Sequence, residues 1–188
     1  LNDINTPWLK IIESADDLRS AVVQMRRKSF GPALVAVAED ARLSDYEDAL
    51  DVHYFKNALD SLKGKGADIR FLRDLLGAEI DHRNLLNILE AEAVGISSDE
   101  IVSMLVPGGR LLPARAFSSI AAGGKDAAMD LLRGSSRFDF PAFEGALSSS
   151  KDMNSLDPVV TWFKEREHAI MKRMSFLHPV SALPVIHY

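Results

Sequence analysis

The stretch that decides the fold is ADIRFLRDLLGAEIDHRNLLNILEAEAV, which covers residues 67–94 of the chain. Its leucines and isoleucines recur every three or four residues, which is the period of one face of an α-helix. Gly95 follows directly, and glycine commonly ends a helix because it tolerates the left-handed backbone conformation. The stretch therefore predicts one long helix with an apolar face.

Helix starts are predicted on both sides of this stretch. Ser44 with Glu47, and Ser97 with Glu100, have the spacing of a capping box, in which each side chain bonds a free backbone N–H of the other residue. Pro158 suits the first turn of a helix, where its missing N–H has no partner to lose. These residues predict helices that begin near residues 45, 98 and 158.

Glycine and proline predict where the helices end. Gly31-Pro32 ends a helix that begins at residue 18, Gly64 ends the one from residue 45, and Pro107-Gly108-Gly109 ends the short one after Ser97. No run of alternating β-branched residues lies between turn signals, so no sheet is expected. We predict an all-α chain whose helices cover residues 18–30, 45–62, 67–94, 114–121, 125–133, 140–147 and 158–177, with a further short helix between Ser97 and Pro107.

Composition excludes several classes of function. The 188 residues hold 22 basic and 27 acidic side chains and a net charge of −5, so a protein that neutralises nucleic-acid phosphates is not expected. Cysteine is absent, which excludes disulfide scaffolds, thiol nucleophiles and cysteine-bound zinc. No window is apolar enough to span a bilayer. We expect a globular chain with an apolar core.

Internal similarity suggests repetition of one helical unit. Residues 18–30 align with residues 126–138, and Glu79-Ile80-Asp81-His82 aligns with Glu165-Arg166-Glu167-His168. The offset differs between the two alignments, so the second copy is shorter. We predict a first repeat over residues 1–112 and a second, abbreviated repeat over residues 113–188, arranged as an irregular bundle or part of a funnel.

Five motifs, taken in order, carry a family resemblance. They are Asp45-Tyr-Glu-Asp-Ala-Leu-Asp51, Glu79-Ile-Asp-His-Arg-Asn-Leu85, Val94-Gly95-Ile96, Leu105-Val-Pro-Gly-Gly109 and Trp162-Phe-Lys-Glu-Arg-Glu167. In this order they resemble the C subunit of archaeal and bacterial A/V-type ATPases, the counterpart of the eukaryotic V-ATPase d (AC39) subunit. That family is normally built of three repeats, so the resemblance implies a C-terminal portion or a shortened member.

The resemblance implies a structural role without catalysis or a cofactor. Such a subunit links the central stalk to the membrane rotor ring and couples ATP turnover to proton or sodium transport. It is peripheral to the membrane, on the cytoplasmic side, and its partners are the rotor-ring and central-stalk subunits. Charged residues on the repeat helices are the candidates for protein contacts: Glu79, Asp81, Arg83, Arg110, Glu165 and Arg166.

Two other functions compete for the same residues. Glu79 with His82, and Glu165 with His168, form the Glu-x-x-His pairs of a carboxylate-bridged di-metal oxidase, with Glu47 and Glu144 as further ligands. Helix phase places the first pair on the apolar face of its helix and the second pair opposite its own apolar stripe, which disfavours a shared metal. For His82 we predict a half-buried, hydrogen-bonded imidazole instead. The other alternative is a helical-repeat adaptor of a different complex.

Overall fold

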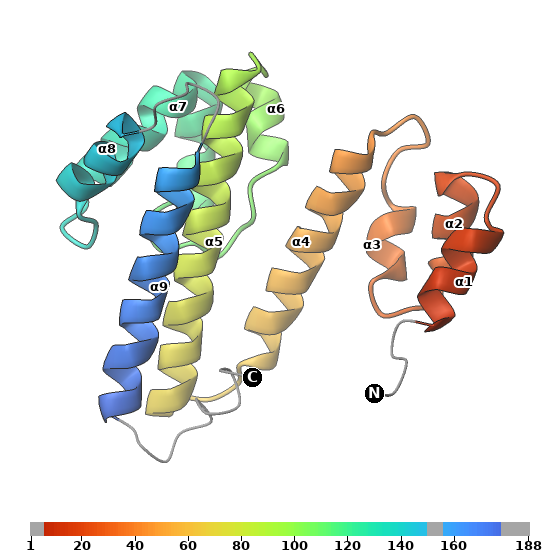
Figure 1. The fold of residues 1–188 in the computed structure, drawn as a ribbon, viewed down its shortest axis with the longest axis horizontal. Helices are drawn as coiled ribbons and strands as arrows, with labels where there is room; N and C mark the ends of the chain where they lie inside the picture. Colours follow the sequence, from red (N-terminus) through yellow and green to blue (C-terminus); the bar gives the residue numbers. More distant parts are fainter. Residues whose placement is uncertain (1–5, 150–155, 178–188) are drawn as a thin grey trace. The chain divides into compact units, whose positions relative to one another are not determined.

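The computed structural model describes residues 6–149 and 156–177, and within these ranges it contains helices and no strand (Figure 1). The all-α prediction is confirmed, whereas the repeat arrangement stays a prediction. The elements are α1 (Thr6–Ser14), α2 (Leu18–Met25), α3 (Gly31–Val35), α4 (Leu43–Ser61), α5 (Ala67–Ala93), α6 (Ser98–Ser103), the 3₁₀ turn η1 (Ala114–Ala116), α7 (Phe117–Arg133), α8 (Phe140–Ser148) and α9 (Asp157–Leu177).

The chain divides into two compact units, Leu1–Tyr54 and Phe55–Tyr188. This division separates packed bodies, whereas the predicted boundary at residues 112 and 113 separates sequence repeats. The repeat boundary therefore stays a prediction.

The first unit holds a small apolar core. Asp17 caps α2 by accepting the Ser20 backbone N–H at 2.7 Å, and the bonds to Ser20 lower the pKa of the Asp17 carboxyl. Apolar residues of α2 and α3 then meet the first half of α4. The buried members of this core are Val22, Met25, Leu34 and Tyr46.

The predicted helix over residues 18–30 is wrong at its end. The helix α2 ends at Met25, and a tight turn follows. This turn brings Gly31 onto the Met25 carbonyl, where a Cβ at position 31 would lie 2.4 Å from the oxygen. Pro32 therefore lies in the first turn of α3, a position that proline tolerates, and it begins a helix rather than ending one.

The helix α4 begins earlier than predicted, at Leu43. The predicted capping box of Ser44 and Glu47 is wrong, because Ser44 already lies inside α4. Asp45 instead caps the start of the helix by accepting the backbone N–H of Arg42 at 2.7 Å. Gly64 has φ of +120°, as expected of a glycine that follows a helix.

In the second unit, α5 and α9 pack along each other in opposite directions, α7 packs on α5, and α8 packs on α9 (Figure 1). The long predicted helix and its glycine stop are confirmed, with Gly95 at φ +73°. The capping box of Ser97 and Glu100 is confirmed, as is the break between two helical segments at Gly124. Aromatic rings from α8, α9 and the preceding loop fill the core: Phe138, Phe140, Phe143, Trp162 and Phe163.

Among the described residues, no helix has the length and the apolar character that crossing a membrane requires.

Candidate functional site

A ladder of three polar side chains on α5 holds the loop that follows α6. Asp81, Asn84 and Asn87 are three residues apart, so they share one face of the helix. The Asp81 carboxylate accepts the backbone N–H groups of three consecutive residues, Arg110, Leu111 and Leu112, at 2.9–3.0 Å. One side chain thus fixes a turn 29 residues away in the sequence.

The two asparagines fix the earlier part of this loop. The Asn84 amide donates to the Val106 carbonyl at 2.9 Å and accepts the Val106 N–H at 2.8 Å. Asn87 donates to the Met104 carbonyl at 3.0 Å. Asn84 is fully buried, so its paired hydrogen bonds satisfy groups that water cannot reach.

The glycines of the loop allow this close approach. A Cβ at Gly109 would lie 2.3 Å from Asp81 Oδ1, and one at Gly108, which has φ of +122°, would lie 2.6 Å from Leu59 Cδ1. The predicted role of Pro107-Gly108-Gly109 as the end of a helix is wrong, because α6 already ends at Ser103. The glycines instead seat the loop on α5.

Burial and hydrogen bonding act in opposite directions on the pKa of Asp81. The side chain is 2% exposed, and burial raises the pKa of its carboxyl. The backbone N–H groups of Leu112, Leu111 and Arg110, together with the Arg110 guanidinium, oppose this rise because they stabilise the charged form. The backbone N–H groups that Asp81 positions thus also stabilise its charged carboxylate.

A second polar contact joins α5 to α9. His82 Nδ1 lies 2.8 Å from Glu167 Oε1, and the imidazole stacks on the Phe163 ring at 4.1 Å between centroids. His82 is 14% exposed, which confirms the half-buried, hydrogen-bonded imidazole. Burial raises the pKa of Glu79, one turn before His82; the Glu167 carboxylate raises it further, and His82 opposes both effects.

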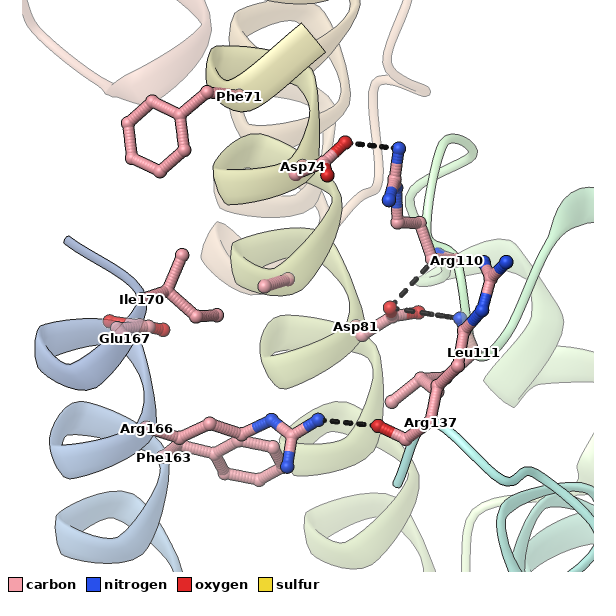
Figure 2. A pocket seen from close by; sticks show the side chains of 11 residues that line it. Phe71, Asp74, Asp81, Arg110, Leu111, Arg137, Phe163, Arg166, Glu167 and Ile170 are labelled. Carbon is pink, nitrogen blue, oxygen red and sulfur yellow. Dashed lines mark hydrogen bonds and ion pairs between the residues drawn. The ribbon is translucent and has the colours of Figure 1, made fainter. Parts of the chain in front are cut away.

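A pocket of about 550 Å³ opens between α5, α9 and the loop of residues 110–111. Figure 2 shows two side chains bonded to the backbone of neighbouring loops. The Asp81 carboxylate accepts the N–H groups of residues 110 and 111, and the Arg166 guanidinium donates to the Arg137 carbonyl. Arg110 pairs with Asp74, which lies two turns before Asp81 on α5. The walls combine apolar side chains with three arginines and three acids; the lining residues are Phe71, Asp74, Ala78, Asp81, Arg110, Leu111, Arg137, Phe163, Arg166, Glu167 and Ile170.

The structure brings half of the predicted contact residues together. Asp81, Arg110 and Arg166 line the pocket, whereas Glu79, Arg83 and Glu165 do not. Arg110 and Glu165 are exposed, and Glu79, Arg83 and Arg166 are half-buried. Because Asp81 is buried, any effect it has on a partner would pass through the turn that it holds. The assignment of these residues to a protein interface stays a prediction.

The residues predicted for a di-metal centre do not converge. His82 faces Glu167, which the Glu-x-x-His pattern does not include, while Glu165 lies in a shallow depression against α8. Within residues 6–149 and 156–177, no group of three or more histidine, aspartate or glutamate side chains has the geometry to hold a metal ion.

Sequence reasoning missed five polar residues of this site: Asp74, Asn84, Asn87, Arg137 and Glu167. The recurrence of a short polar residue every three positions within an apolar helix was a usable signal for the asparagines. Arg137 and Glu167 gave no such signal, because their neighbours come from distant parts of the chain.

Together, the fold and the site define an all-helical scaffold whose buried polar residues hold its own loops. A sequence model of the ATP synthase (C/AC39) subunit family matches residues 4–188, so the chain belongs to this family. It is therefore related to subunits of rotary ATPases, as the motifs predicted.

Three curated relatives are each named as the C subunit of an A-type ATP synthase. The relative from Haloferax volcanii is 26% identical over 93% of this chain, and that from Archaeoglobus fulgidus is 30% identical over 78%. The relative from Thermococcus kodakarensis is 30% identical over 56% of this chain. The chain spans only 50%, 40% and 29% of these proteins, respectively. No solved structure gives a significant match.

Proposed function

We propose that this protein is a non-catalytic structural subunit of an A/V-type rotary ATPase. In this role it links the central stalk to the membrane rotor ring, so that ATP turnover is coupled to proton or sodium transport. It is peripheral to the membrane and reaches it through the complex, on the cytoplasmic side.

The observation that carries the proposal is the family match over residues 4–188. The relatives are named as subunits of A-type ATP synthases, which are machines that work through contacts between many chains. An all-helical chain whose buried polar side chains hold its own loops suits a role in contacts between chains.

The second unit has features that suit the transmission of force. A linker that bends would absorb rotation, so it needs loops that do not shift against its helices. The α5 ladder ties the loop of residues 104–112 to the helix through buried hydrogen bonds, which are costly to break because each leaves an unsatisfied group. The bond between His82 and Glu167 adds a directional link between α5 and α9.

The decisive experiment deletes the gene for this chain and measures the rates of ATP hydrolysis and of ATP-driven ion transport in membrane vesicles. We expect ATP hydrolysis to continue while ATP-driven ion transport is lost, and re-expression of the chain to restore transport. Coupled transport at the normal rate in the deletion strain would contradict the proposal. Co-purification with rotor-ring and central-stalk subunits separates this role from that of an adaptor in another complex.

A charge-reversal pair tests the predicted contact surface. Glu165 is exposed on α9, and Glu144 is exposed on α8. Exchange of Glu165 for lysine should reduce co-purification with the partner subunits, whereas the matched exchange of Glu144 for lysine should not. Equal co-purification of the two variants removes Glu165 from the proposed surface and leaves the coupling role to the deletion experiment.

A further inference from the structure

The pocket between α5 and α9 has hydrogen-bonding capacity that the chain itself does not use. Its three acids are already bonded: Asp81 to the turn at residues 110–112, Glu167 to His82, and Asp74 to Arg110. Ionised carboxylates only accept hydrogen bonds, and these accept them from the protein.

The arginines differ from the acids in this respect. The structure gives the guanidinium of Arg137 no hydrogen bond or ion pair with any described residue, although the backbone carbonyl of Arg137 accepts Arg166 at 2.7 Å. A guanidinium carries five N–H donors, so Arg110 and Arg166 also keep donors beyond the bonds they make. Asp74 and Glu167 keep acceptor sites as well, so what sets Arg137 apart is that each carboxylate of the lining has a charged or polar partner whereas its guanidinium has none among the described residues.

The rest of the lining is apolar. Phe71 and Phe163 are 6% and 3% exposed, and Leu111, Ala78 and Ile170 complete the wall. A volume of about 550 Å³ is typical of pockets that take small molecules, which combine an apolar wall with a few polar groups.

The balance of charge limits the ligand further. Three arginines face three carboxylates, so the lining carries no large positive excess. A multiply charged group such as a phosphate would meet the arginines and be repelled by the acids. A group with a single negative charge, paired with one guanidinium fork, is repelled less and matches the fork geometry.

We propose that this pocket binds a carboxylate carried on an apolar group, with the carboxylate at Arg137 and the apolar group along the apolar wall that runs from Phe163 towards Phe71. The inference does not depend on the proposed coupling role. Either a free amphiphilic acid or an acidic side chain next to an apolar one on a neighbouring protein could supply this chemistry.

The test compares probes that share a tail and differ in head group. Octanoate, 1-octanol and octylammonium are titrated into the intact chain by isothermal titration calorimetry, below the concentrations at which they aggregate. We expect octanoate to bind more tightly than octanol, and octylammonium to bind most weakly. Equal affinity for octanoate and octanol, or no binding of octanoate, overturns the proposal.

Two variants remove separate parts of the site. Arg137→Gln removes the free guanidinium and should weaken octanoate binding by roughly tenfold or more, as expected for the loss of one charge-assisted hydrogen bond. Ala78→Leu fills part of the pocket without changing a charge and should weaken octanoate and octanol alike. Octanoate binding that survives both substitutions overturns the proposal.

Matched controls separate binding from folding. Arg115 is exposed in η1 and Ala122 is exposed on α7, and neither lines the pocket. Arg115→Gln and Ala122→Leu should leave octanoate binding unchanged, and thermal melts verify that all four variants fold. If a control weakens binding as much as its partner variant, the pocket is not the site.

The source of the carboxylate is distinguished with a capped dipeptide. Acetyl-leucyl-glutamate amide offers a carboxylate beside an apolar side chain, and acetyl-leucyl-glutamine amide lacks the charge. Arg137-dependent binding of the first dipeptide but not the second supports a neighbouring protein as the source. Octanoate binding without dipeptide binding supports a free acid.

Discussion

Replacement of Asp81 by asparagine tests whether the α5 ladder stabilises the second unit. The carboxylate makes four contacts with three backbone N–H groups, and Leu111 N–H is shared between both oxygens. An asparagine keeps one oxygen, so it can satisfy Leu111 and only one of Arg110 and Leu112. The remaining N–H would face the amide NH₂, donor against donor.

The expected loss of stability follows from these contacts. A buried donor left without a partner costs about 1–3 kcal/mol, and hydrogen bonds to a charged acceptor contribute about 1.5–3 kcal/mol compared with about 1 kcal/mol for neutral ones. Burial raises the pKa of Asp81, so the uncharged asparagine recovers part of this cost. We expect the free energy of unfolding to fall by about 2–4 kcal/mol, a large share of the roughly 5–15 kcal/mol of a typical domain.

The assay has to report on the second unit alone, because the two compact units need not unfold together. Trp162 contacts Phe138 and Phe143 in the core of that unit, so its fluorescence follows the unit's packing. Trp8 is the other tryptophan, and its replacement by phenylalanine leaves Trp162 as a single probe. Urea unfolding then gives the midpoint and the slope for each variant.

Asp74→Asn is the matched control on the same helix. Its carboxylate pairs with Arg110 and is 45% exposed, so its loss should cost less than about 1 kcal/mol. If Asp81→Asn and Asp74→Asn shift the midpoint equally, the ladder does not stabilise this unit as argued.

Three further results are expected. Burial and a neighbouring carboxylate raise the pKa of Glu79 above its usual 4.5. Above that pH the folded chain therefore binds more protons than the unfolded chain, so its stability falls as the pH rises. Glu79→Gln should make the urea midpoint depend less on pH and should stabilise the chain at neutral pH. Gly109→Ala places a Cβ against the Asp81 carboxylate and should cost about 1–3 kcal/mol, whereas Gly145→Ala, a helical site with open space, should stabilise by about 0.5–1 kcal/mol. Ser97→Ala removes a capping bond and should cost about 1 kcal/mol, with faster amide exchange in α6.

Local signals account for most of the fold that the sequence predicts. Gly95 and the box of Ser97 with Glu100 act within a few residues, and the structure has both. The turn after Met25 was missed because its cause is not local to a motif. The backbone of Gly31 packs on the Met25 carbonyl, and the spacing of apolar residues in the sequence does not predict such a backbone contact.

The site was harder to predict because its partners are distant in sequence. The sequence predicts Asp81 as a charged contact residue, but it does not show that the Asp81 carboxylate binds a turn 29 residues away. His82 was expected to find a hydrogen bond, yet Glu167 lies 85 residues further on and only the packing of α9 against α5 brings it there. The helix phase predicts which face of α5 carries His82, but it does not predict which residue His82 bonds.

Asp81 connects the two roles of this region, because it lines the pocket while its oxygens bond the backbone of residues 110–112. Its charge is thus compensated on the side of the loop. Different substitutions should therefore affect the anchoring of the loop and the binding of an anion. Arg137→Gln removes a hydrogen-bond donor that holds no loop, whereas Gly109→Ala displaces the turn that carries Arg110 and Leu111. The first substitution should change affinity without changing stability, and the second should change both.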